Sequence, residues 1–163
     1  MQTKKLMLLS NSIRQSIIEM LYEAGSGHPG GALGMADILS VLYFDEMNNN
    51  PKKPKDEKRD FFILSNGHTN PVLYATLAQA GYFKEKELLT LRKINSRLQG
   101  HPHNLSLPGV ENSGGPLGQG ISNAVGMAFA EKLLANKYPS LIDHHTYVIA
   151  GDGCLMEGIS QEA

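Results

Sequence analysis

Apolar residues recur at helical spacing in the first part of the chain and form short continuous runs later. Over residues 4–24 the apolar positions predict one amphipathic helix. They are Leu6, Leu9, Ile13, Ile17, Met20, Leu21 and Ala24. Gly25 follows, where a helix C-terminus favours glycine. A second amphipathic helix is predicted over 35–47, with an apolar face of Ile38, Leu39, Leu42, Tyr43 and Met47.

Two short apolar runs, at 61–64 and 146–150, predict buried parallel strands. Each run ends at a glycine-containing turn, and helical segments separate the two. This order predicts an α/β fold with a mainly parallel sheet flanked by helices. Since crossovers between parallel strands are right-handed, both turns should lie along one edge of the sheet.

The remaining pattern predicts further helices and polar connections. Asn70 as N-cap and Pro71 as first helical residue predict a helix that ends at Gly81. A short surface helix over 85–94 and a helix rich in small residues after Gly120 complete the set. The charged stretch 48–60 and the segment 137–143 read as solvated connections, and 98–107 as irregular.

Composition narrows the class of protein. The chain has 163 residues, of which 41% are hydrophobic and 19% charged, as in an ordinary one-domain globular protein. A net charge of -1 favours neither a nucleic-acid partner nor an anionic membrane surface, and no apolar run is long enough for a membrane span. The single cysteine, Cys154, excludes an intrachain disulfide. We therefore expect a cytoplasmic protein.

Gly151-Asp152-Gly153 follows the second strand and carries the first candidate for chemistry. Two glycines allow a sharp turn and a close approach of a ligand. A carboxylate at the carboxyl end of a parallel strand lies where α/β sheets bind ligands, and it suits Mg²⁺ beside phosphate groups. The alternative from the residues alone is a solvated aspartate in a strand-to-helix turn.

Four further segments hold candidate ligand-binding residues. His28 lies in the loop 25–31, and His68 follows the first strand just before a helix start, which favours negative charge. Each could equally be an exposed or turn-capping imidazole. His101 and His103 lack a third nearby ligand and so make a poor zinc site. The segment 113–120 could bind any phosphate at the start of its helix.

Taken together, these segments resemble the transketolase family. The matching motifs are Ser26-Gly27-His28-Pro29-Gly30-Gly31, Ser65-Asn66-Gly67-His68, Gly100-His101-Pro102, Pro116-Leu117-Gly118-Gln119-Gly120, Gly151-Asp152-Gly153 and Glu157-Gly158. They follow the family order across nearly the whole chain. The resemblance implies a thiamine-diphosphate-binding fold, with residues 1–163 as a partial amino-terminal domain. That fold is expected to be incomplete at the C-terminus, since the family motif continues to an asparagine pair beyond Ala163.

The resemblance also implies a role for each matching residue. His28 and His101 would be catalytic histidines of the substrate channel. His68, Gly115, Pro116, Leu117 and Gly153 would contact thiamine diphosphate. Asp152 would bind Mg²⁺, for which Ca²⁺ or Mn²⁺ could substitute, and Glu157 would lie at a subunit interface. The family usually has two threonines where this chain has Ser113-Gly114.

The implied reaction moves a two-carbon ketol unit from a ketose phosphate, such as xylulose 5-phosphate, to an aldose phosphate, such as ribose 5-phosphate. This is a step of the pentose phosphate pathway. Activation of the cofactor would need a glutamate from the pyrimidine-binding domain of a partner, in a homodimer or a heterotetramer. We therefore expect the chain alone to be inactive.

Two alternatives remain at this point. A related thiamine-diphosphate enzyme, such as a deoxyxylulose-phosphate synthase or a dehydrogenase E1 component, would share the Gly-Asp-Gly turn but not all the other motifs. An inactive fragment or a structural partner subunit would share every residue.

Overall fold

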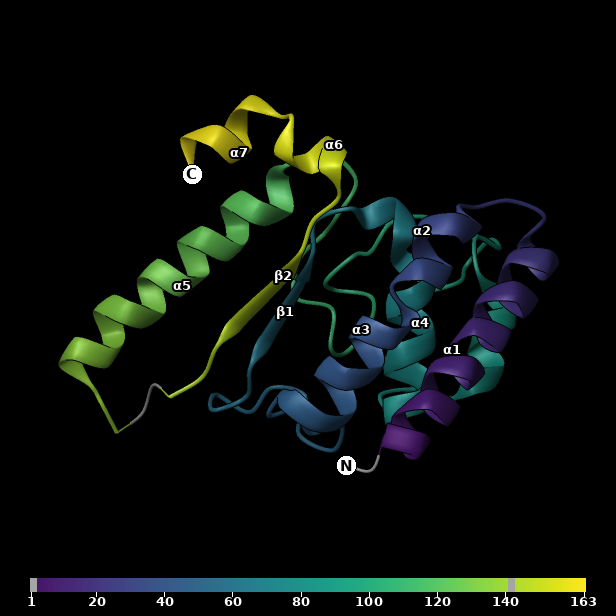
Figure 1. Cartoon of the computed structure of the whole chain (residues 1–163), viewed down its shortest axis with the longest axis horizontal. Helices are drawn as coiled ribbons and strands as arrows, with labels where there is room; N and C mark the ends of the chain where they lie inside the picture. Colours follow the sequence, from purple (N-terminus) through teal and green to yellow (C-terminus); the bar gives the residue numbers. More distant parts are fainter. Residues whose placement is uncertain (1–2, 141–142) are drawn as a thin grey trace.

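A computed structural model of the chain describes residues 3–140 and 143–163 (Figure 1). The elements, in chain order, are α1 (Thr3–Ala24), α2 (Pro29–Gly34), α3 (Ala36–Val41), η1 (Leu42–Glu46), β1 (Phe61–Leu64), η2 (Gly67–Thr69), α4 (Asn70–Ala80), η3 (Glu85–Thr90), α5 (Gln119–Lys137), β2 (Thr146–Ile149), α6 (Asp152–Leu155) and α7 (Gly158–Glu162).

The first helix is confirmed. The centre of its apolar stripe, Ile13, Ile17 and Met20, is fully buried, and the helix packs against α3 and α4. Gly25 ends the helix with a φ of 64°, a conformation that favours glycine. On the polar side of the same helix, Arg14 forms a two-point ion pair with Asp37 of α3, at 2.9 and 2.7 Å. This pair, together with the Ser10 hydroxyl, lowers the pKa of Asp37 to about 2.

The predicted helix over 35–47 is wrong in its boundaries. The chain enters α2 earlier, at Pro29, because proline suits the first helical turn. Gly30 and Gly31 are therefore helical rather than part of a loop. The helical path then continues through α3 and ends in η1, a single wide π-helical turn. Of the predicted apolar face, Ile38 is 51% exposed, whereas the side chains of Leu39, Tyr43 and Met47 are buried.

The two predicted strands pair in parallel, in register from Phe61 opposite Thr146 to Leu64 opposite Ile149. Strand β1 is buried, as predicted. Strand β2 is only half-buried, and Val148 is 41% exposed. The prediction of a fully buried second strand is therefore wrong, because β1 lies in the core through Phe62 and Leu64, whereas Tyr147 and Ile149 of β2 only pack against that core.

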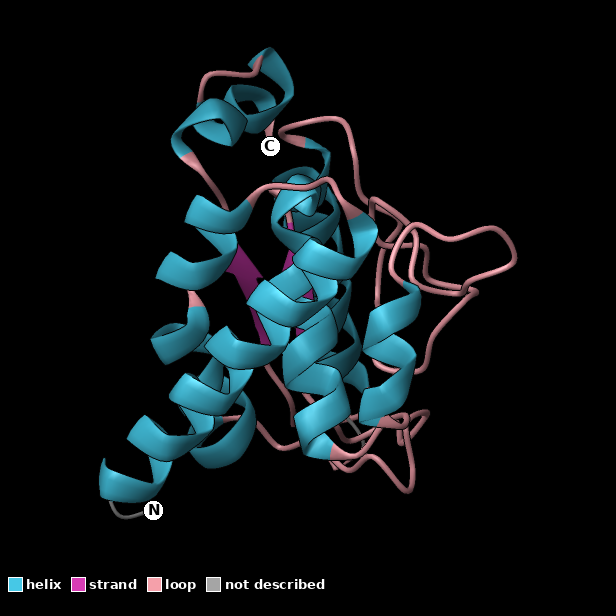
Figure 2. Ribbon diagram, turned by 90° about the vertical axis from the view of Figure 1, so that its right-hand side faces the viewer, coloured by secondary structure: helices cyan, strands magenta, loops and turns pink. Residues whose placement is uncertain are grey.

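Helices flank this sheet on both sides. α5 contacts β2 and β1 on one side, while α3, α4 and then α1 form the larger layer on the other side (Figure 1). Seen from the side of α1, these helices cover most of the two strands (Figure 2). The hydrophobic core lies in this larger layer, where Tyr74, Leu77 and Leu98 are fully buried. Through residues 3–140 and 143–163, no helix combines the length and the apolar character that crossing a bilayer requires.

The amino end of the sheet is held by Asp60. Its buried carboxylate accepts hydrogen bonds from the backbone N–H groups of Asn48 and His145, both at 2.7 Å. The charged connection over 48–60 therefore ends in a structural residue and is not solvated throughout. His144 is buried beside Glu131 of α5, and His145 is largely exposed, which agrees with the predicted structural or exposed positions.

Smaller predictions had mixed outcomes. Gly81 ends α4 with a φ of 92°, as predicted. Asn70 is the first residue of α4 rather than its N-cap, which is Thr69. In place of the α-helix predicted over 85–94, only Glu85–Thr90 is helical, as the 3₁₀ helix η3, and 98–107 is irregular as expected. Part of the predicted connection over 137–143 lies outside the described residues.

Candidate functional site

The turns after β1 and β2 lie at the same edge of the sheet, as right-handed crossovers predicted. They open onto one cavity of about 420 Å³. The residues that line it are Gly31, Gly34, Met35, Asn66, His68, Thr69, Leu117, Gly151, Asp152, Gly153 and Cys154. Segments from the start, the middle and the end of the chain therefore meet in a single site.

His68 is the half-buried centre of a group of three histidines. The rings of His28 and His68 meet edge-on, with their centroids 5.1 Å apart. Burial lowers the pKa of His68 below its usual value, and the nearby His28 and His101 lower that pKa further. At neutral pH the His68 imidazole is therefore uncharged, with one nitrogen able to donate and the other able to accept a hydrogen bond.

His101 lies in this group because hydrogen bonds from α4 hold the loop that carries it. The Asn70 amide and the Tyr74 hydroxyl both donate to the carbonyl oxygen of Gln99, at 2.7 and 3.0 Å. Burial raises the pKa of Tyr74 to about 12, so its hydroxyl stays protonated as a donor. Two residues beyond Gln99, the exposed ring of His101 lies beside Gly115.

The glycine-rich segment 113–120 packs backbone to backbone on the first strand turn. A Cβ atom on Gly67 would lie 3.0 Å from the backbone nitrogen of Gly115, which leaves no room for a side chain. A Cβ atom on Gly120 would lie 2.5 Å from the Cα atom of Ser65. The Ser65 hydroxyl in turn accepts the N–H of Ile121 at 3.2 Å. The start of α5 is thereby fixed against the end of β1.

These contacts place the remaining predicted residues. Leu117 reaches the cavity wall, where a Cβ atom on Gly153 would be 3.0 Å from its Cδ1 atom. Pro116 is exposed and does not line the cavity. Glu157 is also exposed and lies against Gly118, outside the cavity. Six of the nine predicted site residues therefore lie together: His28, His68, His101, Leu117, Asp152 and Gly153. Gly115 lies beside this group, and Pro116 and Glu157 lie outside the cavity.

Asp152 is exposed at the cavity and begins α6. The chain turns here from β2 into α6, and neither of the neighbouring glycines has a positive φ. Gly153 lies close to the Cδ1 atom of Leu117. Across the described ranges, no group of three histidine, cysteine, aspartate or glutamate side chains is arranged to hold a metal ion. Asp152 alone supplies a charged oxygen ligand on this cavity.

Asn66 lines the cavity but had no predicted role. Asn66 has a buried side-chain oxygen with no hydrogen-bond partner within the described part of the chain. Its amide nitrogen lies 3.8 Å from the sulfur of Met35. An unpartnered acceptor is costly to bury, which fits a wall that meets a polar ligand. Its position in the turn after β1 was the available signal, whereas Met35 gave none because it resembled an ordinary apolar helix residue.

Comparison with known families decides between a transketolase and another thiamine-diphosphate enzyme. The model of the family described as "Transketolase, thiamine diphosphate binding domain" matches residues 5–163. The chain belongs to the transketolase family. The predicted family is therefore confirmed, as its amino-terminal thiamine-diphosphate-binding domain, and the chain covers only part of a transketolase.

Individual transketolases show the same likeness. Transketolase 1 of Aliivibrio fischeri is 49% identical over 160 residues, which cover 95% of this chain and 24% of that protein. The solved transketolase of Campylobacter jejuni has a TM-score of 0.94 and 44% identity over 99% of this chain and 26% of its own. That of Leishmania mexicana has a TM-score of 0.93, 44% identity and coverage of 96% and 24%. The chain spans about a quarter of the length of these relatives.

Proposed function

We propose that this chain forms part of a transketolase that transfers a two-carbon ketol unit from a ketose phosphate to an aldose phosphate. The observation that carries the proposal is the meeting of His68 and Asp152 on one cavity at the carboxyl ends of both strands. Ligands of open α/β sheets bind in this place. Membership of the transketolase family supports thiamine diphosphate as the ligand.

The residues of the cavity fit that cofactor. Asp152 offers a carboxylate to Mg²⁺, and Mg²⁺ also takes oxygen ligands from phosphate groups. The neutral His68 would donate a hydrogen bond to the diphosphate, and the buried oxygen of Asn66 would accept one from a polar group of the ligand. The Gly115–Leu117 segment lies where a flat ring can approach the backbone. When bound, thiamine diphosphate supplies a nucleophilic carbon for cleavage of the ketose.

His28 and His101 act on the sugar. Both are exposed side chains next to His68, one on each of two separate loops. An imidazole can donate and accept hydrogen bonds and can move a proton at neutral pH. We assign them to the substrate hydroxyls, which they orient and from which they take and return protons.

We further propose that the active enzyme contains a partner domain that binds the pyrimidine ring and supplies an activating glutamate, in a homodimer or heterotetramer in the cytoplasm. The outer face of α5 supports this part of the proposal. Val125, Phe129 and Leu133 follow one another by one helical turn and are 43%, 62% and 55% exposed. The opposite face of α5 is already packed on the sheet. A helix that is apolar on both sides is typical of a buried helix.

The test is a ketol-transfer assay with xylulose 5-phosphate and ribose 5-phosphate. The isolated chain is expected to be inactive, and the chain combined with the rest of a transketolase is expected to be active with thiamine diphosphate and Mg²⁺. Asp152→Asn should lower that activity by roughly 100-fold, while the exposed control Glu57→Gln leaves it unchanged. Activity of the isolated chain would refute the requirement for a partner domain. Activity that survives removal of Mg²⁺ by EDTA would refute the requirement for the metal.

A further inference from the structure

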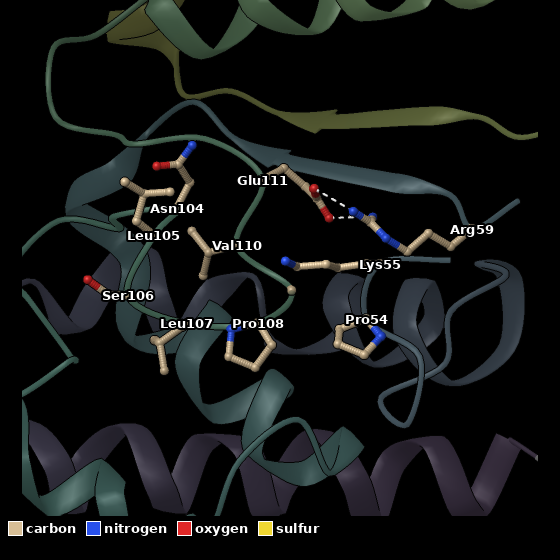
Figure 3. A pocket seen from close by; sticks show the side chains of 11 residues that line it. Pro54, Lys55, Arg59, Asn104, Leu105, Ser106, Leu107, Pro108, Val110 and Glu111 are labelled. Atoms are coloured by element: carbon tan, nitrogen blue, oxygen red, sulfur yellow. Dashed lines mark hydrogen bonds and ion pairs between the residues drawn. The ribbon is translucent and has the colours of Figure 1, made fainter. Parts of the chain in front are cut away.

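The loop that carries His101 and Gly115 is anchored at the far end of the sheet by one ion pair. Arg59 and Glu111 are 52 residues apart in the sequence. The two terminal nitrogens of the Arg59 guanidinium pair with the two carboxylate oxygens of Glu111 (Figure 3). The Nη2–Oε2 distance is 2.9 Å, and the two side chains are only 14% and 12% exposed. Such two-point pairs fix orientation as well as distance.

Arg59 is itself fixed to the first strand. Its Nη1 atom donates to the carbonyl oxygen of Asp60 at 3.1 Å. Its guanidinium carbon lies 4.5 Å from the centre of the ring of Phe61, which begins β1. The planar guanidinium therefore stacks on the strand while it holds Glu111. Arg59 therefore fixes the position of the loop relative to the sheet.

From Glu111 the chain reaches the site within four residues. The N–H of Gly114 donates to the carbonyl oxygen of Pro102 at 2.9 Å, next to His101. Gly114 also packs on the turn after β1, where an added Cβ atom would be 3.4 Å from the Cα atom of Gly67. Since glycines give this stretch little stiffness of its own, its position depends on its anchors.

The loop is also held by packing, since Leu107 and Val110 are buried in the core, but the side of the loop that faces the ion pair is packed less closely. A cavity of about 370 Å³ borders the pair and the loop, and Lys55 lies along it (Figure 3). The cavity is lined by the loop residues 104–111 on one side and by Pro54, Lys55 and Arg59 on the other. Without the pair, this space would let the loop shift.

We propose that Arg59 and Glu111 are positioning residues, which hold the segment 112–118 against the strand turn so that it receives the ring of the cofactor. The expected effect on cofactor binding rests on the proposed function. The physical content of the proposal, a coupling between Glu111 and the Gly114 amide, does not depend on the cofactor.

The first experiment measures hydrogen exchange of the Gly114 amide by NMR in the 163-residue chain. Glu111→Gln keeps the shape of the side chain but removes its charge, and it should speed that exchange about tenfold. Glu111→Asp keeps the charge and should restore most of the protection. The matched control is Asp37→Asn, which breaks the two-point Arg14–Asp37 pair elsewhere and should leave Gly114 exchange unchanged.

The second experiment measures binding of thiamine diphosphate with Mg²⁺ by the chain combined with the rest of a transketolase. Glu111→Gln should raise the Kd about tenfold. Unchanged Gly114 exchange in Glu111→Gln, or equally faster exchange in α4, would overturn the positioning role. If the exchange responds as expected but the unsubstituted assembly binds no cofactor, the proposed function is wrong and the coupling stands.

Discussion

At the scale of single residues, the main electrostatic feature of the site is the lowered pKa of His68. Burial and two neighbouring imidazoles all disfavour the protonated form and lower the pKa of this residue. Because the unfolded chain binds this proton more readily, His68 contributes full stability above its unfolded pKa. That contribution is lost as the pH falls through the lower folded pKa. The His68 ring is thus neutral in the chain without ligand, and a bound anionic ligand could stabilise its protonated form.

This electrostatic coupling gives a prediction for His28. His28→Asn keeps a polar side chain but removes a group that can become positively charged next to His68. The pKa of His68 should therefore rise towards its usual value, without reaching it, because burial remains the larger cause. An NMR titration of the His68 ring measures this shift, with His103→Asn as control, since His103 is bonded to Ser106 instead. An unchanged or lower pKa of His68 would contradict the coupling.

The residues of the site differed in how far the sequence could predict them. His28, His68, His101 and Asp152 sit in glycine-rich turns, and such local motifs are visible without a structure. Glu111 is not marked in this way. Its partner is 52 residues away, and only the folded chain shows that the pair anchors the loop. The role of a residue that acts through distant contacts is absent from local sequence patterns.

At the scale of secondary-structure elements, helices with clear ends were predictable and the rest were not. α1 and α4 have regular apolar patterns and end at glycines with positive φ. α2 could not be predicted, because two consecutive glycines after Pro29 indicate a loop in isolation. In the folded chain Gly31 packs against Thr69, where a Cβ atom would lie 2.7 Å from Cγ2. At Gly31, tertiary contact therefore overrides the local preference for a loop.

The start of α5 gives a prediction for this scale. Gly120→Ala would force a Cβ atom to 2.5 Å from the Cα atom of Ser65, so α5 must move away from β1. We expect a loss of about 2 kcal/mol in the free energy of unfolding. Gly126→Ala, on the same helix, meets nothing within 4 Å and should gain about 1 kcal/mol from helix propensity. Urea unfolding of both variants is the measurement. Equal effects would show that the close approach at Gly120 does not matter.

At the scale of the whole molecule, the hydrophobic core lies on one side of the sheet, and the other side carries an exposed apolar stripe. The layer of α1, α3 and α4 contains the core, although single apolar residues such as Leu8 and Tyr22 are exposed on its outer surface. Beyond the sheet, β2 is half-buried and α5 carries its exposed apolar stripe. The sequence predicted the sheet and its flanking helices, but the exposure of β2 depends on how its side chains pack against the core. The local run of apolar residues does not contain that information.

This asymmetry predicts that association occurs through the outer face of α5. Phe129→Lys places a charge in the middle of the stripe, where a partner would have to bury it unpaired. Because Phe129 is 62% exposed, the isolated chain should change in stability by less than about 0.5 kcal/mol. Affinity for the rest of the transketolase should nevertheless fall at least about tenfold, which corresponds to about 1.4 kcal/mol.

The matched control is Leu8→Lys, an equally exposed apolar position, at 62%, on α1. It lies in the layer that contains the core, on the other side of the sheet from α5, so its affinity for the partner should stay unchanged. Sedimentation velocity at several concentrations measures the association, and thermal unfolding of each isolated variant separates association from stability. Equal weakening by both variants would mean that the contact is not confined to α5. Unchanged association in Phe129→Lys would exclude this face as the interface, because a buried lysine without a counter-charge is incompatible with tight packing.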